Sequence, residues 1–248
     1  MSYDGSRFLG LQSQKSSENT VIGKFVSALA NVGIFSKPVA AGRTDAGVHA
    51  TCQPIAFDLP PFWVDNLSKF GADFLRVRLN ASLAPYIYIK KLYGVSDDFH
   101  PRFDAVKRAY RYIISTKESP FRADYNAYVP SIDISKIKSA IKLFEGEHDF
   151  SMFKKTGSET KSNVRQIFST CAYEKDNMFV MKFVANGFLR SQIRMMSSFL
   201  LKISGGTLSE NELKEQLDCV KKHSSSLAPA SGLYLCGVGF DKKIKLLK

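Results

Sequence analysis

Arg43 and Asp45 stand two residues apart in the segment AAGRTDAGVHA, residues 40–50, and form the pair whose types and spacing best suit chemistry. Gly42 and Gly47 bracket the pair, and glycine is used where φ must be positive or where backbone must approach a ligand closely. A neighbouring cation favours the charged form of a carboxylate. The segment therefore predicts a loop that presents a charged carboxylate to a ligand, with a surface turn and a weak ion pair as the alternative.

Several common catalytic and ligand-binding signatures do not fit this sequence. Gly5 and Gly10 have the spacing of a phosphate loop, but Leu11 and Gln12 stand where that loop requires Lys and then Ser or Thr. No histidine pair has the i, i+4 spacing of a helical zinc site, and no G-x-S-x-G serine elbow occurs. The four cysteines form no CxxC pair, which predicts reduced thiols. We therefore expect no metal.

Cations and aromatic side chains alternate in the segment KRAYRY, which ends at Tyr112. In a strand, Tyr110 and Tyr112 face one side and Arg111 the other. This interleaving suits an unpaired base on a charged backbone, although a half-buried strand gives the same alternation. Further along, Arg190 and Arg194 stand one helical turn apart and could reach a phosphate, with a solvated basic face as the alternative.

The charge balance favours a polyanionic partner such as a nucleic acid. The chain has 35 basic and 23 acidic residues, a net charge of +12, and a pI near 9.5. Residues 1–104 hold 11 basic and 9 acidic residues, a net of +2, whereas residues 105–248 hold 24 and 14, a net of +10. We expect phosphate contacts in the second half, although a lysine-rich surface also keeps a protein soluble.

A mixed set of helices and strands must position these residues. Apolar residues at helical spacing predict four helices, at 20–31, 135–145, 187–203 and after the capping box Ser209-x-x-Glu212. Runs of aromatic and β-branched residues predict strands at 86–95, 109–115, 167–173, 179–184 and 233–240, with a hairpin turn at Asp176-Asn177.

The order of these elements favours an α+β fold with mostly antiparallel sheets and flanking helices, since strands outnumber helices and do not alternate strictly with them. Composition and charge both change over residues 97–107. We therefore predict two mixed domains, residues 1–104 and residues 105–248. No apolar run of 18 residues occurs, which predicts that no segment spans a membrane.

Six segments together resemble one enzyme family over nearly the whole chain. The chain is similar to tRNA pseudouridine synthases of the TruA family, and the GRTDAGVHA loop is close to diagnostic for that family. The matching segments are YDGSRFLGLQSQ at 3–14, AGRTDAGVHA at 41–50, DDFHPRFDAVKRAYRYII at 97–114, GEHDFSMF at 146–153, FLRSQIR at 188–194 and GLYL at 232–235.

The resemblance implies isomerisation of uridine at positions 38–40 of the tRNA anticodon arm by a cytoplasmic homodimer that uses no cofactor. It implies two α+β domains that flank a basic cleft. By similarity, Asp45 is the catalytic group, acting at the ribose as a nucleophile or as a base. Substrate contacts are implied for Arg43 and Arg194 near the flipped nucleotide, for Tyr110 stacked on the uracil, and for Leu233 as an apolar wall.

Two other classes of protein stay open at this point. One is a non-catalytic relative that binds tRNA without modifying it, and the other is a general basic RNA-binding module, which would need no loop carboxylate. One departure concerns the first motif, because the family usually has a strand before it and here Tyr3 is almost the first residue. The sequence therefore does not predict which strand forms the edge of the first sheet.

Overall fold

The computed structural model describes residues 1–14, 17–157, 160–242 and 244–247. The chain divides into two compact units, one formed by Met1–Val106 and Leu235–Lys248 and the other by Lys107–Tyr234. Strand β7 (Ala105–Ser115) carries the chain into the second unit, and strand β12 (Leu233–Phe240) returns it to the first. Residues 235–248 thus belong to the unit that holds the N-terminus. The division into domains at residue 104 stays a prediction.

The first unit contains strands in the order β5-β1-β3-β12, with β5 at Ile87–Tyr88, β1 at Ser2–Tyr3 and β3 at His49–Ala50, and β1 pairs antiparallel with both β5 and β3. Tyr3 pairs with Ala50 on one side and with Ile87 on the other. The remaining strands form two short ladders, which pair β2 (Val39–Ala40) with β4 (Ile55–Ala56) and β6 (Tyr93–Gly94) with β13 (Lys245–Leu246).

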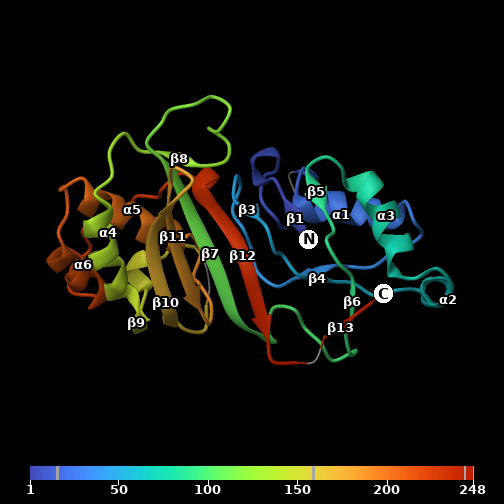
Figure 1. Ribbon diagram of the computed structural model, residues 1–248. Coiled ribbons are helices and arrows are strands. Elements are labelled where there is room, and N and C mark those ends of the chain that lie inside the picture. The colour runs from blue at the N-terminus through green and yellow to red at the C-terminus, as the bar shows by residue number, and fades with distance from the viewer. Residues whose placement is uncertain (15–16, 158–159, 243, 248) are drawn as a thin grey trace. The chain divides into compact units, whose positions relative to one another are not determined.

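Three α-helices belong to the first unit: α1 (Val21–Ala30), α2 (Pro61–Phe70) and α3 (Ala72–Leu83). Helix α3 packs against α1, α2 and β5, and Figure 1 shows these elements grouped together. Leu29 of α1 and Leu75 and Leu79 of α3 are fully buried. These leucines lie in the core between α1 and α3. A 3-10 turn, η1 (Gly5–Arg7), follows β1 directly.

The second unit is built on an antiparallel sheet in the order β7-β11-β10-β9, with β11 at Met178–Ala185, β10 at Val164–Lys175 and β9 at Gly146–Asp149. The short strand β8 (Ala127–Tyr128) pairs with β7 in parallel. Helices α4 (Ile134–Ala140), α5 (Gln192–Ser204) and α6 (Glu210–Leu217) gather on one side of this sheet in Figure 1. The described residues of this unit also form 3-10 turns at Ile141–Phe144, Ser151–Phe153 and Ala230–Gly232.

Several predicted elements are confirmed, and so is the α+β fold with mostly antiparallel pairing. Strand β12 has the predicted bounds. The Thr20 side chain accepts the Gly23 N–H at the start of α1, and both hydrogen bonds of the predicted capping box begin α6 at Ser209. Asp176 and Asn177 have φ values of 53° and 60°, as the predicted tight turn between β10 and β11 requires.

The third predicted helix was placed five residues too early, because it was predicted from residue 187 and the structure begins it at Gln192. Ser191 has a left-handed backbone with φ of 59°, and the Leu189 N–H donates to the side chain of Gln192. Because helix α5 starts only at Gln192, Arg190 lies outside it. The prediction that Arg190 and Arg194 stand one turn apart on a helix is therefore wrong.

The strand predicted over residues 86–95 is also interrupted. The Ile89 N–H donates to the Asn80 side chain, whose amide donates back to the Ile89 carbonyl. These bonds take the backbone groups that a continuous strand would use, so only the two short strands β5 and β6 form here. Helices α2 and α3 were not predicted. The spacing of Leu75, Leu79 and Leu83 on α3 was a visible signal for one of them.

Candidate active site

The predicted catalytic loop, residues 41–50, follows β2, includes β3 at its end and is anchored just before Asp45. The Leu11 N–H donates to the Thr44 carbonyl at 3.2 Å. The Thr44 hydroxyl lies 2.7 Å from the hydroxyl of Tyr3, and both side chains are buried. Strand β1 therefore fixes the residue that precedes Asp45.

The loop turns sharply just after Asp45. The Val48 N–H donates to the Asp45 carbonyl at 3.2 Å, which closes a four-residue turn. Gly47, at the third position, has φ of 77°, where an L side chain would be strained. The positive φ at this position thus explains why the sequence has glycine at residue 47.

The first sequence motif holds the far end of the same loop. The Gly5 N–H donates to Nδ1 of His49 at 3.0 Å, and His49 is only 2% exposed. A Cβ on Gly5 would lie 2.0 Å from the Val48 carbonyl oxygen, so no larger residue fits there. Segment 3–14 therefore serves as the support of segment 41–50, which explains why the two motifs occur together.

The exposure of the loop side chains alternates around the predicted catalytic group. Thr44 and Val48 are buried, Asp45 is partly exposed, and Arg43 is exposed. A fixed backbone thus presents a carboxylate and a guanidinium toward solvent from one loop. The roles of Arg43 and Asp45 at a ligand stay predictions.

The predicted residues Tyr110, Arg194 and Leu233 belong to the second unit. Tyr110 and Tyr112 are buried on one face of β7, opposite Phe183 and Met181 of β11, while Arg111 is exposed on the other face. The predicted alternation is confirmed. The Tyr110 ring is 8% exposed and meets the Phe188 ring edge to face, with centroids 5.3 Å apart.

Arg194 is tied to the segment that leads into β12. Its Nε donates to the Ala228 carbonyl at 2.7 Å, and the Ala228 N–H donates to the Arg194 carbonyl at 3.1 Å. This two-way contact orients the guanidinium. An oriented guanidinium loses little freedom when it binds an anion, because its planar fork is already placed.

Tyr112, predicted only as one of the aromatic residues that alternate with cations on a strand, connects these parts of the second unit. Its hydroxyl donates to the Pro229 carbonyl at 2.9 Å. Burial raises the pKa of Tyr112 well above its ordinary value, while the nearby charge of Arg194 acts in the opposite direction. Gly232 packs directly on the Tyr112 ring, and the following residue, Leu233, is 6% exposed. Tyr112 therefore links strand β7, which carries Tyr110, to the segment of residues 228–233. Arg194 contacts the same segment, and Leu233 ends it.

Within residues 1–14, 17–157, 160–242 and 244–247, no three His, Cys, Asp or Glu side chains are grouped so as to hold a metal ion. No helix in these ranges is long and apolar enough to cross a membrane.

Comparison with known proteins gives one consistent result. Residues 140–241 match the family model described as "tRNA pseudouridine synthase". Three curated proteins named "tRNA pseudouridine synthase A" align along nearly their whole length. The one from Helicobacter hepaticus is 41% identical over 97% of this chain and 97% of its own. Those from Wolinella succinogenes and Campylobacter jejuni are each 40% identical, covering 98% and 94% of this chain and 94% and 95% of their own. At this identity over almost the full length, the chain belongs to the tRNA pseudouridine synthase A family.

Proposed function

We propose that the protein isomerises uridine to pseudouridine at positions 38–40 of the anticodon arm of tRNA. The observation that carries this proposal is the anchored loop of residues 41–50. Its backbone is fixed by buried contacts before and after Asp45, while the Asp45 side chain is partly exposed. A carboxylate held in this way is preorganised, because its position does not have to be found during turnover.

The reaction breaks the bond between ribose C1′ and uracil N1, turns the detached base and joins C1′ to C5. The proton leaves C5 and N1 gains one, so the product is an isomer and no electrons are exchanged with another molecule. Asp45 acts at the ribose, either as a nucleophile on C1′ or as a base. The target must leave the base stack to be reached, so base flipping belongs to the mechanism.

The other predicted site residues supply binding. Arg43 and Arg194 contact phosphate through charge-assisted hydrogen bonds near the flipped nucleotide. The ring of Tyr110 stacks on the uracil, its hydroxyl helps to remove the C5 proton, and Leu233 forms an apolar wall. The contact between Arg194 and Ala228 and the edge-to-face contact of Tyr110 with Phe188 support these roles, because both hold side chains in one orientation.

The test is release of tritium from tRNA that is labelled at C5 of its uridines. Wild-type protein should release tritium, and Asp45→Ala should release none. Transcripts that keep uridine at only one of positions 38, 39 and 40 then locate the site. If wild-type protein binds tRNA but releases no tritium, the non-catalytic tRNA-binding class is favoured instead.

The tRNA partner is supported by charge in both compact units. The first unit holds 15 basic and 10 acidic residues and the second holds 20 and 13, so their net charges are +5 and +7. Neutralising phosphates releases counterions, so the affinity for tRNA should fall steeply as salt rises. An affinity for tRNA that stays constant between about 50 and 200 mM salt would contradict this partner.

The family resemblance also supports a cytoplasmic homodimer that works without a metal ion. Sedimentation equilibrium of the full chain should give twice the monomer mass. Tritium release should be unchanged by EDTA, because the isomerisation needs neither an electron carrier nor a Lewis acid. Loss of activity in EDTA that returns with a divalent cation would contradict the metal-free mechanism.

A further inference from the structure

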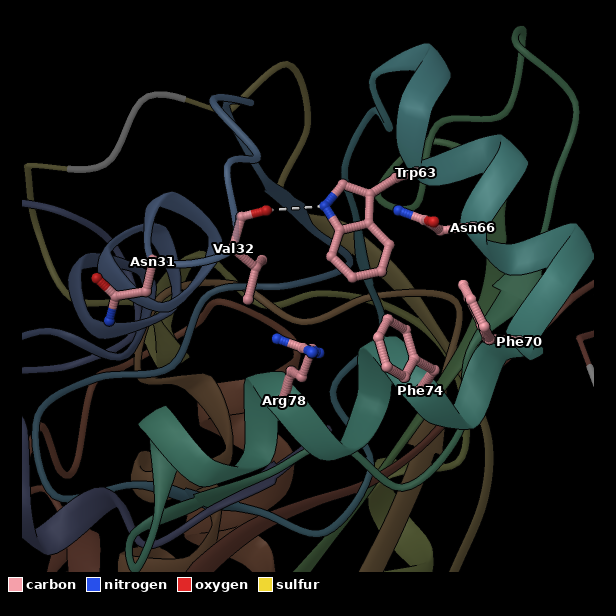
Figure 2. Close-up of a pocket in the computed structure, with 7 residues that line it drawn as sticks. All are labelled: Asn31, Val32, Trp63, Asn66, Phe70, Phe74 and Arg78. Carbon is pink, nitrogen blue, oxygen red and sulfur yellow. Dashed lines mark hydrogen bonds between the residues drawn. The ribbon is translucent and has the colours of Figure 1, made fainter.

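A pocket of about 370 Å³ lies in the first unit, away from the loop of residues 41–50 in sequence and formed by the end of α1 with α2 and α3 (Figure 2). This volume is at the lower end of the range of about 300–1,000 Å³ typical of small-molecule sites. Seven residues line the pocket: Asn31, Val32, Trp63, Asn66, Phe70, Phe74 and Arg78.

Aromatic rings form one wall of this pocket. The Trp63 indole is fixed by its Nε1–H, which donates to the Val32 carbonyl at 2.8 Å, as Figure 2 shows. The centroid of the Phe74 ring lies 5.9 Å from the centroid of the Trp63 ring and 5.1 Å from that of the Phe70 ring. Phe70 remains 60% exposed. Water therefore contacts much of the Phe70 side chain, and a planar ligand that covered this apolar area would be stabilised by its burial.

The pocket also contains polar side chains that form no hydrogen bond or ion pair with the described residues. The Arg78 guanidinium lies 4.4 Å from the centroid of the Phe74 ring. Within the part of the chain that the structure describes, it makes no ion pair or hydrogen bond, and neither does the carboxamide of Asn31 or Asn66. Arg76 on the same helix is different, because it pairs with Asp73 at 2.7 Å and donates to Tyr88.

This set of groups matches the chemistry of a nucleotide. An aromatic wall stacks on a base, a guanidinium binds a phosphate, and carboxamides offer a donor and an acceptor to the edge of the base. We propose that the pocket binds an unpaired nucleotide, with its base against Phe70 and Phe74 and its phosphate on Arg78. Resting on the proposed function, we take this nucleotide to be part of the bound tRNA and separate from the target uridine.

Trp63 makes the proposal directly measurable, because it is the single tryptophan of the chain and lines the pocket. The full-length protein is titrated with tRNA, with an RNA duplex that has no unpaired nucleotides, and with AMP or UMP. Tryptophan emission is followed with correction for RNA absorbance. We expect saturable quenching by tRNA and little by the duplex.

Four variants separate the pocket from its surroundings. Phe70→Ala should abolish the quenching and weaken tRNA binding roughly 5- to 150-fold, the range for loss of one stacked base. Arg78→Ala should lower the salt slope of tRNA binding by about 1, as expected for one lost phosphate contact. The matched controls are Phe62→Ala, an exposed phenylalanine of α2 that does not line the pocket, and Arg76→Ala. Both controls should keep the quenching.

Each outcome decides the proposal. Quenching by tRNA alone assigns the nucleotide to RNA, and equal quenching by AMP or UMP assigns it to a free nucleotide, so both support a nucleotide pocket. The proposal is overturned if tRNA binds and tritium is released while Trp63 emission stays constant. It is also overturned if emission changes with protein concentration and not with nucleic acid, because a second copy then covers the pocket. Quenching by tRNA without tritium release would leave the pocket standing and remove the proposed function.

Discussion

The hydroxyl groups of Tyr3 and Thr44 lie 2.7 Å apart in the interior of the first unit, although 41 residues separate them along the chain. Thr44 immediately precedes Asp45, so this contact transmits the position of strand β1 to the proposed catalytic loop. We expect Tyr3→Phe to lower the free energy of unfolding by about 1–3 kcal/mol, because the buried Thr44 hydroxyl loses its partner. The initial rate of tritium release should fall as well. Urea unfolding and the tritium assay measure the two effects.

The matched control for this change is Tyr86→Phe. Tyr86 is 44% exposed, and its hydroxyl makes no hydrogen bond within the residues described. Stability and rate should both stay at the wild-type level. A Tyr3→Phe protein that behaves like this control would show that the loop is held by its backbone contacts alone.

Asp45→Asn should remove turnover while preserving the affinity for tRNA. The substitution removes the charge and the nucleophilic oxygen but nearly keeps the shape of the side chain. We expect tritium release to fall by about 10⁴-fold or more, as is usual when a nucleophile or base is lost. Filter binding measures the affinity in parallel. Turnover close to wild type in pure Asp45→Asn protein would remove Asp45 from the mechanism.

Tyr110→Phe should slow the release of the C5 proton more than it weakens tRNA binding. The ring survives the change, so stacking on the uracil and the contact with Phe188 are kept. A general acid or base typically contributes about 10²- to 10⁴-fold to rate, and the lost hydroxyl should lie in this range. Single-turnover tritium release and binding are compared on one tRNA. Equal losses in rate and affinity would show that the hydroxyl only positions the substrate.

Gly5→Ala should disrupt the loop through a steric clash. The new Cβ would lie 2.0 Å from the Val48 carbonyl oxygen, so the backbone must move. We expect a loss of about 3 kcal/mol in the free energy of unfolding, measured in urea. The control is Gly205→Ala, whose Cβ would meet its nearest atom at an ordinary 3.5 Å and should cost less than about 0.5 kcal/mol. Equal stability of the two variants would contradict the support that segment 3–14 gives to the loop.

The raised pKa of Tyr112 predicts that the free energy of unfolding falls at high pH. Burial raises its pKa above the ordinary value of about 10, so above pH 10 the unfolded chain releases a proton that the folded chain retains. The free energy of unfolding should therefore fall as the pH rises above about 10, by up to 1.36 kcal/mol per pH unit from this group. Tyr112→Phe should be less stable at pH 8, because the Pro229 carbonyl loses its donor, yet should show a shallower alkaline slope. If the free energy of unfolding falls equally steeply above pH 10 in wild type and Tyr112→Phe, the alkaline loss of stability does not come from Tyr112.

Local signals in the sequence predicted much of the fold. Thr20 caps α1, Ser209 caps α6, and Asp176-Asn177 forms its hairpin turn, since each depends only on neighbours a few residues away. The start of α5 was misplaced because the left-handed backbone of Ser191 leaves no trace in apolar spacing. Helix α2 was missed because Trp63 is its single buried residue, so it has no apolar stripe.

The candidate site shows the same division between local and distant information. The loop of Arg43 and Asp45 was predictable because its glycines and charges are adjacent in sequence. The supports of the loop were not, since the contact between Tyr3 and Thr44 and the bond from Gly5 to His49 depend on the pairing of strands β1 and β3. Tyr112 was seen only as half of an alternating pattern, because its partner Pro229 lies 117 residues away.

The return of the chain through β12 has a consequence for protein synthesis. The carbonyl of Leu235 accepts the N–H groups of Thr51 and Cys52, which directly follow the proposed catalytic loop. A ribosome completes the continuous stretch of residues 107–234 before it adds this acceptor. A nascent chain therefore carries Arg43, Asp45, Tyr110, Arg194 and Leu233 before the loop has its last backbone support. A chain that ended at residue 234 would therefore hold every proposed site residue and still lack the backbone acceptor that Leu235 supplies to Thr51 and Cys52.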